Sequence, residues 1–140
     1  MPSPDIKRQT ELYLCRKLMA ALPGRTFVPF SGGDETHDSF DIEPPFGVIA
    51  VTEAEKTCPT ESTWQVSGTA QWVTHITEAT SPEHSQQVRE MYSALGSLPP
   101  DSSDSAFSFH GIDVDHVDMT EDDKSRARAG IVKFAAGVGG

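Results

Sequence analysis

Carboxylates are the residues of this chain whose grouping could do chemistry, and they gather in two runs that contain no lysine or arginine. The first run consists of Asp34, Glu35, Asp38, Asp41 and Glu43. The second consists of Asp113, Asp115, Asp118, Glu121, Asp122 and Asp123. Closely spaced carboxylates can coordinate a divalent cation, and they repel phosphate groups. Their spacing decides between these two kinds of chemistry.

The second run begins like a calcium-binding loop but does not continue like one. An EF-hand loop needs an oxygen ligand at its fifth position, glycine at its sixth and a bidentate acid at its twelfth. Counted from Asp113, these positions hold Val117, Asp118 and Lys124. We therefore interpret this run as a solvated acidic loop with no bound metal.

Other reactive residue types also lack the surroundings that a catalytic or metal site needs. Cys15 falls on an apolar helical stripe and Cys58 in a turn without an activating base. Ser31-Gly32-Gly33 lacks the lysine and the helix start of a phosphate loop. The histidines are scattered, without the pairing typical of zinc sites: His37, His75, His84, His110 and His116. The sequence predicts neither an enzyme nor a cofactor.

Composition narrows the class of protein further. The chain has 140 residues and 21 acids against 11 bases, which gives a formal net charge of −10. We expect one domain over residues 1–140 and no sequence-independent adhesion to nucleic acid. Two cysteines cannot form a disulfide scaffold, and no apolar stretch is long enough for a membrane span or signal peptide. These features predict a protein made in the cytoplasm, without a membrane partner.

A long strand over residues 63–76 anchors the fold prediction, because its apolar and polar residues alternate. Both tryptophans belong to the apolar parity, which predicts that a helix pair covers that face. The apolar parity consists of Trp64, Val66, Ala70, Trp72 and Ile76. The polar parity consists of Thr63, Gln65, Ser67, Thr69, Gln71 and His75.

The remaining patterns predict an α+β fold in the order α-β-β-β-α-β-β. It would have a mainly antiparallel sheet of about five strands with two helices on one face. A first helix ends before Pro23, and a second begins at Ser81-Pro82. The first helix should face the sheet through Leu12, Cys15, Leu18, Met19 and Leu22, and face water through Glu11, Arg16 and Lys17. Further strands are expected at 26–30, 46–57, from Phe107, and at 128–136, with a loop at 31–45 and a linker at 98–105.

This layout resembles the tail terminator, or tail completion, proteins of long-tailed bacteriophages, which include the minor tail protein U family. The matching features are the helix from Leu12 to Leu22, the Pro44-Pro45-Phe46 start of a strand, the strand from Trp64 to Ile76 leading into the Ser81-Pro82 helix, and a closing strand from Ile131 to Ala136. The resemblance rests on element order and size over nearly the whole chain. It therefore assigns no role to individual residues.

The resemblance implies a non-catalytic virion protein at the tail-neck junction. It would form a homo-oligomeric ring, a hexamer in this family, that caps the tail tube and contacts the tail tube protein and a neck or head-completion protein. DNA would pass through the lumen without specific binding. Residues of the two acidic runs are then candidates for the lumen or the subunit interface: Asp34, Glu35, Asp38, Asp41, Glu43, Asp113, Asp115 and Asp118.

Two other functions stay open on the sequence. One is a different neck component, such as a head-closure protein, which the same element order and charge would suit. The other is a cytosolic α+β protein that binds a ligand on the uncovered sheet face. Its site would be lined by Gln65, Ser67, Thr69, Gln71 and His75. A concave pocket on that face would favour ligand binding, whereas a flat face covered by another subunit would favour assembly.

Overall fold

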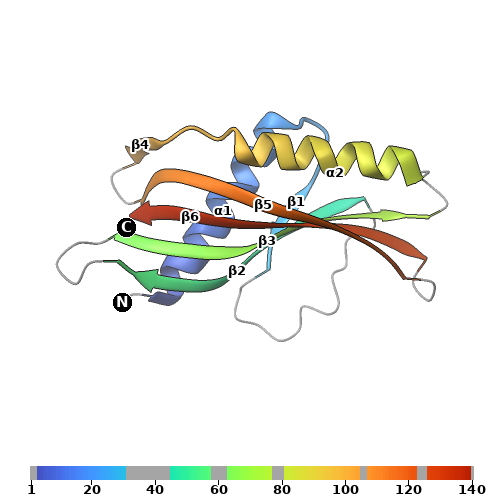
Figure 1. Ribbon diagram of the computed structural model, residues 1–140. Coiled ribbons are helices and arrows are strands. Elements are labelled where there is room, and N and C mark those ends of the chain that lie inside the picture. Colours follow the sequence, from blue (N-terminus) through green and yellow to red (C-terminus); the bar gives the residue numbers. More distant parts are fainter. Residues whose placement is uncertain are drawn as a thin grey trace.

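The computed structural model describes residues 3–30, 45–57, 63–76, 81–104, 107–122 and 126–139. Two helices, α1 (Ser3–Ala21) and α2 (Ser81–Gly96), pack on one six-stranded sheet (Figure 1). The strands are β1 (Phe27–Pro29), β2 (Phe46–Lys56), β3 (Thr63–His75), β4 (Asp101–Asp104), β5 (Phe107–Asp122) and β6 (Ala127–Gly139). The predicted α+β class is confirmed. The short strand β4, inside the segment expected to be a linker, adds to the predicted order.

The sheet has the strand order β1-β2-β3-β6-β5-β4. Only β1 and β2 pair in parallel, and the other neighbours are antiparallel. The last strand, β6, lies in the middle of the sheet, between β3 and β5 (Figure 1). The sheet is therefore complete only when β6 has paired with β3 on one side and β5 on the other.

One face of the sheet carries the core, with the parity predicted for β3. Val66, Ala70 and Trp72 are buried, and Trp72 is only 1% exposed. The helices close this core from the same side, where α1 contacts β1 and β2, and α2 contacts β5, β6 and β3. The helix residues that join the cluster include Leu14, Leu18, Val88, Met91 and Leu95. The prediction of two helices on one face is confirmed.

The orientation predicted for α1 is partly wrong. Cys15 and Leu18 are buried as expected, but Leu12 and Met19 are 44% and 39% exposed. Glu11, expected in water, is fully buried. Its carboxylate accepts a hydrogen bond from the Val51 backbone N–H at 2.7 Å, and this contact offsets the cost of burying a polar group.

Glu11 lies where β1 stops short beside β2. Gly47 donates to Thr26 and Ile49 accepts from Phe30, so the backbone groups of alternate β2 residues face β1. Val51 is the next residue of this series, but β1 has already ended at Pro29. Two side chains of α1 take over at this edge, since Glu11 accepts from Val51 and Lys7 donates to the Thr52 carbonyl at 3.3 Å. The helix thereby replaces a neighbouring strand.

As far as Asp122, the second acidic run lies in a strand, which corrects the prediction of a loop. β5 extends to Asp122 and pairs with β6 over most of its length. A register shift between Val114 and Val117 leaves Asp115 and His116 opposite the single residue Lys133. This bulge inserts one residue and breaks the alternation that would have identified a strand.

Candidate functional site

The sheet face opposite the helices is the main surface that the structure offers for function. Pairing registers place its residues in rows that cross β2, β3, β6 and β5. One row consists of Glu53, Ser67, Ala135 and Asp113. The adjacent row consists of Glu55, Gln65, Gly137 and Gly111. We call these two rows the acidic-rimmed face, because carboxylates stand at their borders.

Acidic side chains border this face on β2 and β5, and the residues between the borders are Gln65, Ser67, Ala135 and Gly137. Glu53 and Glu55 are exposed on β2, and Asp113 is exposed on β5. Neighbouring strands lie about 4.8 Å apart, so the three intervals from β2 to β5 separate the two borders by roughly 14 Å. Asp115 continues the β5 border next to the cation Lys133 of β6, and both are exposed. The balance of these five charges is negative.

The structure places part of the predicted site on this face. Asp113 and Asp115 lie on β5 with exposed side chains, and the backbone of Asp118, on the same strand, pairs with Ile131 of β6. The first acidic run, Asp34 to Glu43, lies outside the described residues. Glu53 and Glu55 were not singled out from the sequence, although their alternation with Ala54 indicates an outward-facing pair in a strand.

The polar parity of β3 occupies the middle of the same face. Its side chains stand in one line along a strand that is paired on both sides, and they project from the sheet without converging on a point. Ser67 donates to Glu53 at 3.2 Å, which is a contact within the face. Gln65 is exposed, and Ser67, Thr69, Gln71 and His75 are half-buried. This arrangement suits contact with a broad surface better than enclosure of a small ligand.

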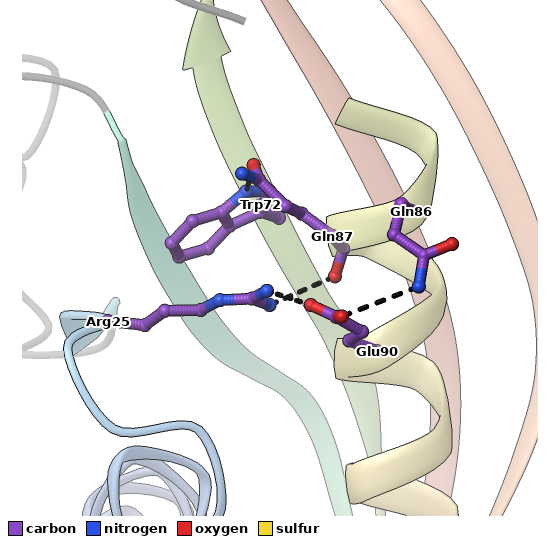
Figure 2. Close-up of polar contacts among 5 residues, drawn as sticks. All are labelled: Arg25, Trp72, Gln86, Gln87 and Glu90. Atoms are coloured by element: carbon purple, nitrogen blue, oxygen red, sulfur yellow. Dashed lines mark hydrogen bonds and ion pairs between the residues drawn. The ribbon is translucent and has the colours of Figure 1, made fainter. Parts of the chain in front are cut away.

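A second polar cluster joins the segment between α1 and β1 to α2, over the buried tryptophan (Figure 2). Arg25 donates to the Gln87 carbonyl at 3.1 Å and forms an ion pair with Glu90. Its guanidinium carbon lies 5.2 Å from the centre of the Trp72 ring. Trp72 donates from Nε1 to the Gln87 side chain at 3.0 Å, and Gln86 donates to Glu90 at 3.4 Å. The polar groups of this cluster satisfy one another's hydrogen-bonding capacity, so the cluster fixes α2 against the sheet.

An open groove next to this cluster separates the ends of the two helices. Its polar groups include Arg25 and Glu90, which are already paired with each other. The lining residues are Ala21, Leu22, Pro23, Arg25, Glu90, Ser93, Ala94 and Ser97. Apart from that ion pair, the lining is small or apolar and offers no group with the protonation behaviour of a catalytic acid or base.

Two buried titratable side chains are held in their neutral forms. Burial raises the pKa of the Cys15 thiol to about 12, with a further contribution from the charge of Glu11. Burial also raises the pKa of Tyr13 to about 12, followed by the effect of Asp101, which accepts a hydrogen bond from the Tyr13 hydroxyl at 3.2 Å. The prediction of an unreactive Cys15 agrees with this environment, since only the thiolate is a strong nucleophile.

His84 belongs to α2, and its buried side chain contacts β3. Its Nδ1 lies 2.8 Å from the Thr74 hydroxyl, and the side chain is 2% exposed. Burial lowers the pKa of His84, and the positive charge of Arg128 lowers it further, while a backbone interaction with Ala129 acts in the opposite direction. His84 is therefore neutral at physiological pH and serves packing.

Neither a metal centre nor a spanning helix emerges from the residues that the structure describes. Within those ranges, no three or more His, Cys, Asp or Glu side chains are grouped so that they could hold a metal ion. Neither described helix combines the length and apolar character needed to cross a membrane.

Comparison with known proteins supports the fold and leaves the family open. No protein-family model matches the chain, and no curated protein matches it either. Among solved structures, it is similar to a chain described as "Virion of native gene transfer agent (GTA) particle". The two chains share 14% sequence identity and superpose with a TM-score of 0.61, and the match covers 100% of each. The likeness shows a common fold along the whole chain.

Proposed function

We infer that this chain is a structural protein of a virion and has no catalytic role. The observation that carries the inference is the full-length structural match to a chain of a gene transfer agent virion. The unreactive Cys15 and Tyr13 and the single line of polar residues along β3 agree with a subunit that acts by making contacts. The chain's size and order of elements also resemble those of tail terminator proteins.

Within a virion, we place the protein at the tail-neck junction as a tail terminator. In that role, copies of the chain form a ring, a hexamer, that ends the tail tube and joins it to the neck. Its partners are further copies of itself, the tail tube protein and a neck or head-completion protein, while DNA passes through the lumen. The net charge of −10 supports this placement, because an acidic protein does not hold the phosphate groups of DNA that passes through it.

Deleting the gene from its parent particle-producing genome tests this role directly. A tail terminator limits tube growth, so the deletion should yield heads without joined tails and tubes of uncontrolled length in electron micrographs. Wild-type protein added to the lysate should restore joining of heads and tails. The control variant Arg89→Glu, which reverses one exposed charge on α2, should fold and restore joining as the wild type does.

Two results would contradict the proposal in different ways. Tubes of normal length attached to DNA-free or leaking heads would assign the chain to head closure instead. Particles of normal composition and infectivity without the protein would remove it from the virion altogether and would favour a ligand-binding role for the polar residues of β3.

A further inference from the structure

The outward surface of α1 carries a stripe in which cations and apolar side chains alternate. Arg8, Leu12, Arg16 and Met19 follow one another at steps of four, four and three residues, which places them on one side of a helix. All four are exposed, including the two apolar residues Leu12 and Met19, which are 44% and 39% exposed. We call these residues the α1 stripe.

The charge on this side of α1 is positive. Lys7 and Lys17 flank the α1 stripe and are half-buried, with Lys7 donating to Thr52 and Lys17 lying 3.5 Å from Asp101. The acid Glu11, by contrast, is fully buried against Val51. Among the α1 side chains that the structure describes, the charges that reach the surface are therefore those of lysine and arginine.

The acidic-rimmed face has the complementary character and lies on the other side of the sheet. Its two borders stand roughly 14 Å apart, and a helix with side chains is about 10–12 Å across. Between the borders lie the exposed Gln65 and the small residues Ser67, Ala135 and Gly137, over which a helix can approach the sheet closely. Cationic side chains of a docked helix would meet Glu53, Glu55 or Asp113 on either side.

We propose that the α1 stripe of one copy docks on the acidic-rimmed face of the next copy. This inference rests on the proposed ring and names the surfaces that would build it. The two surfaces are unlike and lie on opposite faces of one sheet, so each copy offers one of each to its neighbours. Contacts of this head-to-tail kind generate a closed ring or an open filament, and a two-fold dimer does not use them.

Charge reversal on each surface tests the contact. The stripe variant is Arg16→Glu, and the face variant combines Glu53→Lys with Asp113→Lys. Each should weaken self-association of the purified chain by about tenfold or more, because like charges then meet across the interface. Arg89→Glu on α2 is the matched control and should associate like the wild type, and unchanged unfolding midpoints should show that all variants fold.

Mixing the two defective variants gives the sharpest result. In an alternating assembly, the reversed stripe meets the reversed face, and the wild-type stripe of the other variant meets the wild-type face. Native mass spectrometry at the highest soluble concentration should therefore show assemblies of more than two copies for the wild type and for the mixture, but not for either variant alone.

Other outcomes overturn the docking contact. Rings that form equally well with both variants would refute it and leave the tail role standing, since that role is tested separately by tube length. A wild type that stays monomeric at every concentration, or assembles only as a dimer, would refute it as well. So would loss of duplex DNA binding in Arg16→Glu with unchanged self-association, which would assign the α1 stripe to the phosphate backbone.

Discussion

At the scale of single residues, His84 makes the stability of the protein depend on pH. Its folded pKa lies below the ordinary value of 6.5, because burial and Arg128 disfavour the charged form. The unfolded chain therefore binds a proton more readily than the folded chain. The contribution of His84 to the free energy of unfolding is fully present above about pH 6.5 and is lost as the pH falls through the folded pKa. Denaturant unfolding between about pH 7.5 and about pH 5 should show a falling free energy of unfolding.

The variant His84→Gln isolates this contribution from that of other groups. Glutamine keeps a polar partner for the Thr74 hydroxyl but has no proton to gain in this range. Its free energy of unfolding should change less with pH than that of the wild type. Parallel curves for the two proteins would show that His84 is not the group responsible.

Trp72 and Gln71 are neighbours on β3 that should respond very differently to truncation. Trp72 is buried, contacts Arg25 and donates to Gln87, whereas Gln71 is half-buried on the opposite face. Trp72→Ala should cost about 3–5 kcal/mol of unfolding free energy, and Gln71→Ala less than about 1 kcal/mol in the monomer. Equal losses measured in denaturant would contradict the assignment of the two faces.

At the scale of elements, the edge of β2 depends on α1. Glu11→Ala would leave the buried Val51 N–H without its acceptor and should cost about 1–3 kcal/mol. Glu11→Gln keeps a side-chain oxygen in reach and should cost less. Hydrogen exchange should report the same difference locally, with the Val51 amide exchanging faster in the alanine variant. An alanine variant as stable as the glutamine variant would show that this hydrogen bond does not hold the edge.

Bulges interrupt the periodicity from which strands are predicted. The strand β3 is predictable because its alternation is regular, and the α2 stripe because its helical spacing is regular. In β5, the register shift between Val114 and Val117 interrupts the alternation, so the acidic residues beyond it are not recognised as part of a strand. In β2, a shift between Val51 and Glu53 lies opposite Gly68, where a Cβ would collide with the backbone of Ala50 and Val51.

The face of α1 escapes prediction for a different reason. Hydrophobic spacing alone places Leu12 and Met19 inside and Glu11 outside, but the bulged edge of β2 needs a hydrogen-bond acceptor at that position. A contact with an element 40 residues away in the sequence decides which side of the helix is buried. Local patterns carry no information about such a partner, so the exposed stripe could be recognised only in the folded chain.

At the scale of the whole molecule, pairing across the sheet assembles the acidic-rimmed face from distant segments. Asp113 is visible in the sequence as part of an acidic run, but its place opposite Glu53 depends on β6 lying between β3 and β5. The sequence thus indicates which residues are charged and which strands are amphipathic. The order of strands in the sheet, which brings the two borders together, follows from long-range pairing.

The net charge of −10 bears on how DNA would behave in the proposed ring. An attractive lumen would hold the phosphates of a passing duplex, whereas carboxylates leave it mobile. We propose that Asp34, Glu35, Asp38 and Asp41 line this passage. Changing all four to asparagine and glutamine should raise the affinity of the assembled protein for duplex DNA at low salt and slow DNA delivery by the particle, because fewer carboxylates then oppose the phosphates.

The matched control for this experiment neutralises the same number of charges on the face assigned to subunit contact. A variant that combines Glu53→Gln, Glu55→Gln, Asp113→Asn and Asp115→Asn changes the net charge equally, but it should weaken assembly first. The lumen variant should assemble normally and melt close to the wild-type temperature. DNA affinity that rises equally in both variants would show a response to net charge alone, and an imaged ring with residues 34–41 on its outer rim would refute the lumen assignment.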